Sequence, residues 1–213
     1  MPDRQRKPAV LSHDFYERPT LEVACDLIGM VLVHDSGAGR AAGMIVEAEA
    51  YIGETDPACH AARGLTRRTE PLYGPPGRAY VYFNYGMHYL VNAVTERSGV
   101  PAAVLLRALE PLEGVELMRL RRARPLAPAV ALCRGPGNLT RALGIDLALN
   151  RADLSASALT IEDWGFRPGP LTWTPRVGIS VGTEPYWRVL VPGHSAVSGP
   201  PARRRAANPE AQG

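Results

Sequence analysis

The sequence has few cysteines and no long apolar run, and each absence excludes a class of protein. The three cysteines, Cys25, Cys59 and Cys133, form an odd and scattered set, so we expect no disulfide framework. None has a partner at a zinc-like spacing such as CxxC, which argues against a metal site. No stretch approaches the roughly 18 apolar residues of a membrane span, and the N-terminal residues are too polar for a signal peptide. These absences predict a reduced, cytoplasmic protein without a metal.

Lysine is almost absent, so arginine carries the positive charge. Lys7 is the single lysine, and the formal net charge is +3. Both ends of the chain are basic, which leaves the body between them close to neutral. The total charge therefore gives no argument for a polyanionic ligand.

Two local clusters of arginine carry that argument instead. Residues 117–145 contain no acid, and their arginines are Arg119, Arg121, Arg122, Arg124, Arg134 and Arg141. A second cluster consists of Arg63, Arg67, Arg68 and Arg78. Guanidinium groups pair well with phosphates, which favours nucleic-acid contact. The alternative is that each cluster is an ordinary solvated surface.

Length and composition predict one globular domain with many turns. The chain has 213 residues, of which 46% are hydrophobic, and it contains 21 glycines and 20 prolines. We assign residues 15–198 to the domain, and 1–14 and 199–213 to basic, flexible tails.

Periodicity and turn residues predict the order of the elements. We expect a helix at 20–26 capped by Thr20, a strand pair at 30–34 and 40–52, and a long loop at 53–78. Two strands at 78–83 and 88–94 should form a hairpin. The remaining expected elements are a strand at 101–109, a helix at 111–124, a short helix capped by Asn138, and strands at 158–164, 176–181 and 187–191.

The run at 40–52 alternates in a way that predicts two faces. One face should hold Met44, Val46, Ala48 and Ala50, and the other Ile45, Glu47, Glu49 and Tyr51. An edge strand with its acidic face in water would explain the carboxylates. If they are buried they need a partner, and Arg107, in the apolar strand at 101–109, needs a carboxylate for the same reason. Asn92 is a third polar residue in an apolar strand.

Tyrosines gather between positions 51 and 89, where six of the eight lie. Tyr80 and Tyr82 share one strand face, which a core strand or an aromatic binding surface would explain equally. Tyr85 and Met87 lie at the expected hairpin tip, where polar residues are usual. Large apolar side chains at an exposed tip suit a wedge between base steps.

Long stretches of the sequence resemble one known family. The family is that of the alkyladenine (3-methyladenine or methylpurine) DNA glycosylases. The stretches that resemble it are IVEAEAYIGETDPACHA, GRAYVYFNYGMHYLVNAV and AVLLRALEPLEGVELMR. The likeness runs in order from about Leu21 to Ser198. It implies an α+β fold, a single domain with a curved, mostly antiparallel β-sheet surrounded by helices, and a protruding hairpin that inserts into DNA.

The resemblance also implies roles for single residues. Glu49 matches the general base that activates water, and Arg107 matches the arginine that helps to hold this water. Tyr51, His60 and Tyr82 match side chains that sandwich the flipped base, and Asn92 matches the residue that would collide with the 2-amino group of guanine. Tyr85 matches the residue that enters the minor groove, and Met87 resembles its neighbour that lies against the adjacent base pair. Arg122, in the first arginine cluster, is a further expected DNA contact.

The implied function is base-excision DNA repair. The protein would flip alkylated purines out of double-stranded DNA and hydrolyse the glycosidic bond, as a monomer without a cofactor, in the cytoplasm at the nucleoid. The scarcity of lysine predicts a monofunctional enzyme, since strand cleavage through a Schiff base needs an amine. Two alternatives are a non-catalytic nucleic-acid-binding module of the same fold and a hydrolase of free nucleosides.

Overall fold

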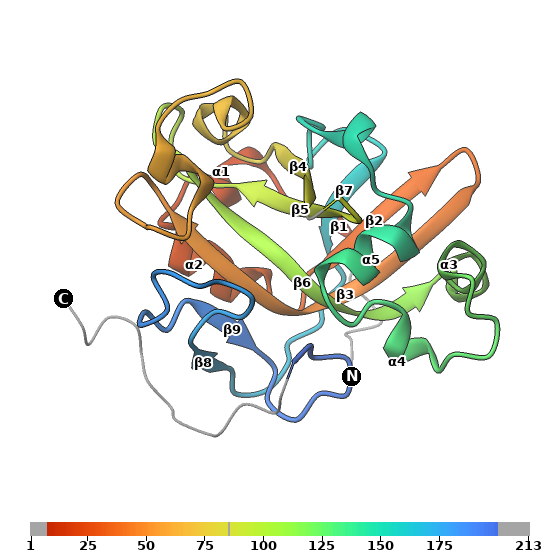
Figure 1. Cartoon of the computed structure of the whole chain (residues 1–213). Helices are drawn as coiled ribbons and strands as arrows, with labels where there is room; N and C mark the ends of the chain where they lie inside the picture. The colour runs from red at the N-terminus through yellow and green to blue at the C-terminus, as the bar shows by residue number, and fades with distance from the viewer. Residues whose placement is uncertain (1–7, 85, 200–213) are drawn as a thin grey trace.

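The computed structural model describes residues 8–84 and 86–199, and within them one antiparallel sheet forms the centre of an α+β domain (Figure 1). The strands are β1 (Ala9–Val10), β2 (Val31–Ser36), β3 (Gly39–Ile52), β4 (Ala79–Asn84), β5 (His88–Val94), β6 (Ala102–Glu113), β7 (Leu159–Asp163), β8 (Thr172–Thr174) and β9 (Arg188–Leu190). Their order is β1-β7-β2-β3-β6-β5-β4, and β9 joins β8 to β3.

Short helices surround this sheet. They are α1 (His13–Tyr16), α2 (Thr20–Leu27), α3 (Val115–Arg122), α4 (Ala129–Leu132) and α5 (Pro136–Leu143), with 3₁₀ helices η1 (His60–Arg63), η2 (Glu70–Tyr73) and η3 (Leu147–Leu149). Apolar residues of α2, α3 and α5 pack with β3, β5 and β6 in the main apolar cluster. The long strands β3 and β6 are therefore central and buried, and the predicted sheet with helices around it is confirmed.

Two bulges offset each other where β3 pairs with β6. Val46 is the extra residue on β3, because Ile45 pairs with Leu109 but Glu47 pairs with Ala108. Arg107 is then the extra residue on β6, because the next pair joins positions 48 and 106. A bulge turns the following side chains to the other face of a sheet, and bulges are frequent beside active sites. Here they bring Glu47, Glu49 and Arg107 to one face.

The bulges correct the predicted alternation of β3. Ile45 packs in the main apolar cluster together with Ala48 and Ala50, and not on the face of Glu49. Met44 and Val46 pack in a second cluster on the opposite face. The prediction is correct for residues after Val46 and wrong before it, because one extra residue reverses the alternation.

Several predicted boundaries also differ from the structure. The helix expected at 111–124 begins only at Val115, because β6 continues to Glu113 and Gly114 ends it with a φ of 70°. Residues 176–181 form no strand, and β8 pairs with β9 instead. Asn138 lies inside α5, which Gly135 precedes, so it is not the cap. Thr20 is the first residue of α2, and its hydroxyl donates to Glu96 at 2.7 Å.

The predicted hairpin is confirmed as β4 and β5, which pair from position 79 with 93 to position 84 with 88. Tyr85 lies outside the described residues. Met87 follows it in the turn, and 71% of its surface is exposed. At the N-terminal end, β1 and the start of α1 lie inside the stretch 1–14 that the sequence assigns to a tail. No helix in residues 8–84 and 86–199 is long and apolar enough to cross a membrane.

Candidate active site

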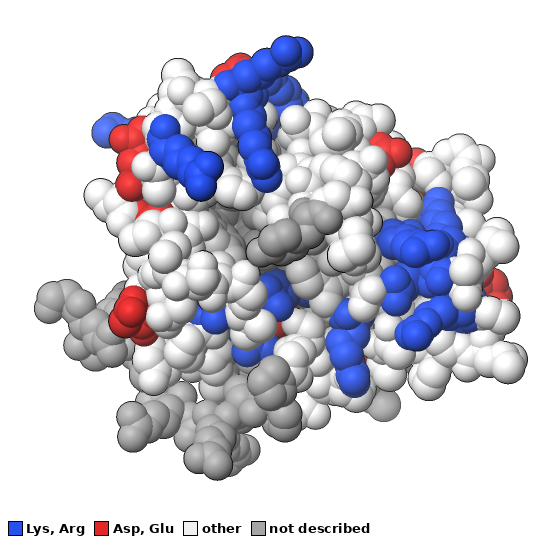
Figure 2. Space-filling model, in the orientation of Figure 1, with Lys and Arg blue, Asp and Glu red and all other residues white. Residues whose placement is uncertain are grey.

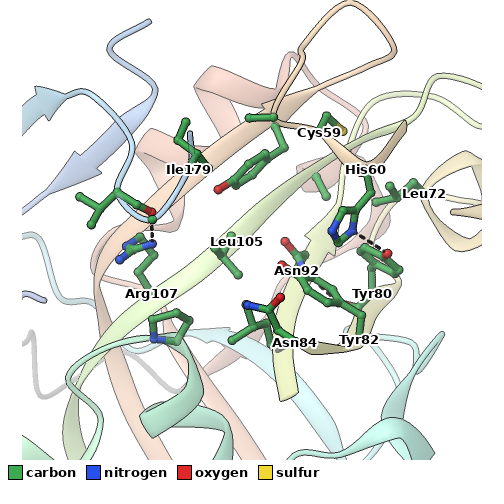
Figure 3. Close-up of a pocket in the computed structure, with 17 residues that line it drawn as sticks. Cys59, His60, Leu72, Tyr80, Tyr82, Asn84, Asn92, Leu105, Arg107 and Ile179 are labelled. Carbon is green, nitrogen blue, oxygen red and sulfur yellow. Dashed lines mark hydrogen bonds between the residues drawn. The ribbon is translucent and has the colours of Figure 1, made fainter. Parts of the chain in front are cut away.

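A pocket of about 290 Å³ opens beside the β4–β5 hairpin (Figure 3). The end of β3, η1, β4, β5, β6 and the loop at 177–179 form its walls. Its side chains are largely aromatic or apolar, with a few polar groups pointing inward, which is the usual composition of a small-molecule site. Its aromatic and polar lining residues include Tyr51, His60, Tyr80, Tyr82, Asn84, Asn92 and Arg107, and Val177 also lines it.

His60, Tyr80 and Tyr82 form one aromatic wall. A hydrogen bond of 2.9 Å joins the imidazole Nδ1 of His60 to the Tyr80 hydroxyl. The rings of His60 and Tyr82 are 4.5 Å apart between centroids. Burial, with Arg68 and Arg63 nearby, lowers the pKa of His60 to about 4, so this ring is neutral at pH 7. The three rings thus present a neutral aromatic surface to the pocket.

Tyr51 joins this pocket to a buried carboxylate. Its hydroxyl donates to Oε2 of Glu49 at 3.0 Å, while its ring lines the pocket. The guanidinium of Arg176 lies over the same ring, 4.7 Å from the centroid. Tyr51 is therefore fixed by the groups behind it.

Glu49 is fully buried directly behind the pocket wall. Besides Tyr51, its carboxylate accepts hydrogen bonds from Nη1 of Arg107 at 3.1 Å and from the backbone N–H of Val177 at 2.7 Å. Burial raises the pKa of Glu49, whereas Arg107, the Val177 N–H and the Tyr51 hydroxyl lower it. All three donors line the pocket and favour the ionised form, but burial outweighs them, so the pKa of Glu49 lies above its usual value. The alternative of an edge strand with Glu49 in water is therefore wrong.

Arg107 contacts both carboxylates, whereas the sequence predicted that it needs one of the two. Its Nε donates to Oε1 of Glu47 at 2.8 Å, and Nη1 reaches Glu49. Nη1 also donates to the Val177 carbonyl at 3.2 Å, as Figure 3 shows. Glu47 is fully buried and has a second cation, Arg188, whose Nε lies 2.7 Å from Oε1. Two arginines thus balance two carboxylates in this buried cluster.

A second buried ion pair holds the wall around Tyr51, and sequence reasoning missed it. Arg176 and Asp56 make two hydrogen bonds, of 2.6 and 2.7 Å, and both side chains are buried. Asp56 also accepts from the backbone N–H groups of Ile52 and Ala58. The pair therefore ties the loop after β3 to the segment before β9. The run RVGIS resembled a strand, so nothing in it indicated a buried arginine.

The other predicted site residues divide between the pocket and the surface. Asn92 is buried at the pocket wall, where its amide donates to the Tyr80 carbonyl at 3.0 Å. Met87 lies in the exposed hairpin turn, and Arg122 is half-buried at the end of α3. Tyr85 is outside the described residues. Asn84 also lines the pocket, although no sequence pattern marked it as a site residue.

The arginine clusters lie on the face that the pocket opens on. Figure 2 shows basic side chains over α3 and α5, and a second group over the segment between β3 and β4. Some arginines of the 117–145 cluster make hydrogen bonds within the fold; for example, Arg121 donates to the Leu143 carbonyl at 2.7 Å. Arg124, Arg134 and Arg141 are exposed, as are Arg63, Arg67 and Arg68. The exposed arginines form a basic rim on two sides of this face.

Comparison with known proteins identifies the class of the protein as a DNA glycosylase. The family model for methylpurine-DNA glycosylase matches residues 14–195, and the chain belongs to this family. A protein of Chlorobium phaeobacteroides is 48% identical over 89% of this chain and 95% of its own length. A protein of Rubrobacter xylanophilus is 50% identical over 84% of this chain and 91% of its own, and one of Methanocella arvoryzae 50% over 82% and 87%. All three are named as candidate 3-methyladenine DNA glycosylases.

Proposed function

We propose that this DNA glycosylase removes alkylated purines, mainly 3-methyladenine, by flipping them from double-stranded DNA into the pocket beside Tyr51. The observation that carries the proposal is the buried Glu49 carboxylate, held by three groups that line an aromatic pocket. A base inside a duplex must leave the stack before its glycosidic bond can be reached, and damaged bases unstack at lower cost.

The reaction is hydrolysis with one carboxylate as the base. Glu49 accepts a proton from a water whose oxygen attacks the anomeric carbon, and the electrons of the breaking bond go to the departing purine. An alkylated purine already carries positive charge, so it leaves without a proton from an acid. Arg107 orients the water and favours the ionised form of Glu49 against the effect of burial. The carboxylate also stabilises the oxocarbenium-like transition state.

The pocket walls select the base. Tyr51, His60 and Tyr82 all line the pocket, and a flat purine stacks between the ring of Tyr51 and those of His60 and Tyr82. Asn92 lies at the buried wall, where its side chain would collide with the 2-amino group of guanine and so disfavour normal guanine. At the hairpin tip, Tyr85 fills the space of the flipped base and Met87 lies against the adjacent pair.

The test is Glu49→Gln, which keeps the shape of the side chain but removes the base. We expect base release from 3-methyladenine DNA to be abolished, while binding to abasic-site DNA remains. Glu162→Gln is a matched control, because Glu162 is also buried in a strand but bonds to Trp164 outside the pocket. Base release by Glu49→Gln at the unaltered rate would remove Glu49 from the mechanism. DNA binding without base release by the unaltered protein would support a binding module instead.

The enzyme should be monofunctional and leave an abasic site. A lyase step needs an amine that attacks the sugar, and the chain offers only the single lysine, Lys7, and Pro2 if Met1 is removed; both lie outside the described residues. We expect borohydride to trap no covalent adduct between the protein and lesion-containing DNA. A trapped adduct would contradict this part of the proposal. The proposed partner of the enzyme is double-stranded DNA that contains damaged purines. The enzyme would act on this DNA as a monomer, at the nucleoid.

A further inference from the structure

The end of the described chain is part of the buried ion cluster behind the pocket. Ser198 lies eight residues after β9 and is 6% exposed. The family match ends at residue 195, three positions earlier. The resemblance in sequence reaches about Ser198, but none of the site residues named above is Ser198.

All the polar groups of Ser198 contact this cluster. Its backbone N–H donates to Oε2 of Glu47 at 2.6 Å, and its hydroxyl donates to Oε1 at 3.0 Å. Its carbonyl accepts from Nη2 of Arg188 at 2.7 Å. The hydroxyl oxygen also accepts from Nη2 of Arg107 at 3.2 Å. A single residue thus bonds to Glu47 and to both arginines that neutralise it.

These contacts complete the fixation of Arg107. Its Nε is held by Glu47 and its Nη1 by Glu49 and the Val177 carbonyl. Among the described residues, the recorded hydrogen-bond partner of Nη2 is the Ser198 hydroxyl. A planar guanidinium held at all three nitrogens has one orientation, and here that orientation directs Nη1 to Glu49.

We propose that Ser198 is a positioning residue for base excision, acting through Arg107. The hydroxyl links Glu47 to Nη2 of Arg107 and so keeps the guanidinium in the plane in which Nη1 reaches Glu49 and the pocket. The inference rests on the proposed function, because it assigns Ser198 to the step that Arg107 and Glu49 carry out. Loss of the hydroxyl leaves the buried Nη2 without its partner, and Arg107 then tilts away from the productive orientation.

A matched pair of variants isolates the hydroxyl. Ser198→Thr keeps it, and Ser198→Val has the same shape without it, so any steric cost is shared by both. Under single-turnover conditions we expect Ser198→Val to release 3-methyladenine roughly tenfold or more slowly than Ser198→Thr, since hydrogen bonds to charged groups are worth enough for that factor. Affinity for abasic-site DNA should agree within about twofold between the two variants. Equal rates of base release would overturn the inference.

A double-mutant cycle separates positioning from simple stabilisation. Ser198→Ala should slow base release in the otherwise unaltered chain but change the residual rate little in an Arg107→Met background, because its effect passes through Arg107. Ser195→Ala is the control, since Ser195 is exposed and its hydroxyl makes no hydrogen bond that the structure records. Equal slowing in both backgrounds, or slowing that follows a lower melting temperature alone, would reduce Ser198 to a structural role.

The two proposals fail in different ways. If Glu49→Gln retains base release, the proposed mechanism is wrong whatever Ser198 does. If Glu49→Gln abolishes base release while the Thr and Val variants of Ser198 act alike, only the positioning role is lost.

Discussion

At the scale of the residue, Tyr51 combines two contacts that sequence reasoning treated separately. Its ring lines the pocket, and its hydroxyl donates to the Glu49 carboxylate behind the pocket wall at 3.0 Å. That hydrogen bond lowers the pKa of Glu49, as do Arg107 and the Val177 N–H, whereas burial and the nearby Glu47 raise it. In the proposed mechanism the same side chain would stack on the flipped base and adjust the protonation of Glu49, the general base that activates the attacking water.

Tyr51→Phe should separate these contacts. The ring remains, so abasic-site binding should change little, but Glu49 loses a donor to its ionised form and its pKa rises. A general base must be deprotonated, so base release falls as the pH drops through this pKa. A higher pKa therefore moves the fall to higher pH. The measurement is single-turnover base release between about pH 4 and pH 8.

Tyr82→Phe is the matched control for this prediction. It removes a hydroxyl from the same pocket, but the structure records no hydrogen bond between that hydroxyl and Glu49. The acid limb of its pH profile should stay in place. Coincident acid limbs for Tyr51→Phe and the unaltered enzyme would show that the Tyr51 hydroxyl does not act on Glu49.

The sequence predicted the side chains of the site better than the backbone and loop groups that hold those side chains in place. Glu49, Arg107 and Asn92 stood out because polar groups in apolar strands need partners, and the first two do pair. The Val177 N–H could not be found in this way, because every residue except proline has one. Ser198 lies in a loop, where a serine is ordinary and carries no signal of burial.

At the scale of the element, the bulges at Val46 and Arg107 explain what alternation could not predict. Each adds one residue to its strand, and neither lies at a glycine or proline that would have indicated it. The pairing of Ile45 with Leu109 and of Glu49 with Leu105 has the same register on both sides of the bulges. The strands therefore stay paired, while the bulged region turns Arg107 to the face of the carboxylates.

The ion pair between Arg176 and Asp56 connects two elements, and breaking it should destabilise the fold. Asp56→Asn leaves the guanidinium of Arg176 buried without its counter-charge. Removing one partner of a buried pair commonly costs about 3–5 kcal/mol. We expect a loss of this size in the free energy of unfolding, measured with urea. Base release should also decline, because Asp56 holds the loop beside Tyr51.

Asp26→Asn is the corresponding surface control. Asp26 pairs with Arg18 at 2.9 Å, but 52% of its side chain is exposed. Exposed pairs contribute at most about 1 kcal/mol, so this variant should unfold near the unaltered midpoint. Similar losses for both aspartates would contradict a special role for the buried pair.

At the scale of the whole molecule, the position of the arginines on one face says more about ligand binding than the net charge of the chain does. The sequence correctly indicated that the body carries its basic character in two clusters, and both reach the face shown in Figure 2. It could not tell which arginines were free, because Arg119 and Arg121 make hydrogen bonds within the fold. Arg63 is exposed and lines a second cavity that shares His60 with the base pocket. If the protein flips a nucleotide into the pocket as proposed, Arg63 is well placed to contact a nearby phosphate.

Arg63→Ala should weaken binding to abasic-site duplex DNA and reduce its dependence on salt. For B-DNA, log K falls with log salt at about −0.9 per phosphate neutralised, so losing one contact should make the slope shallower by about 0.9. The loss should be the same for every lesion, because a phosphate contact carries no base information. Arg167→Ala is the control, since Asp163 holds Arg167 with hydrogen bonds of 2.8 and 2.9 Å at the end of β7. An unchanged slope for Arg63→Ala would place the DNA backbone elsewhere on this face.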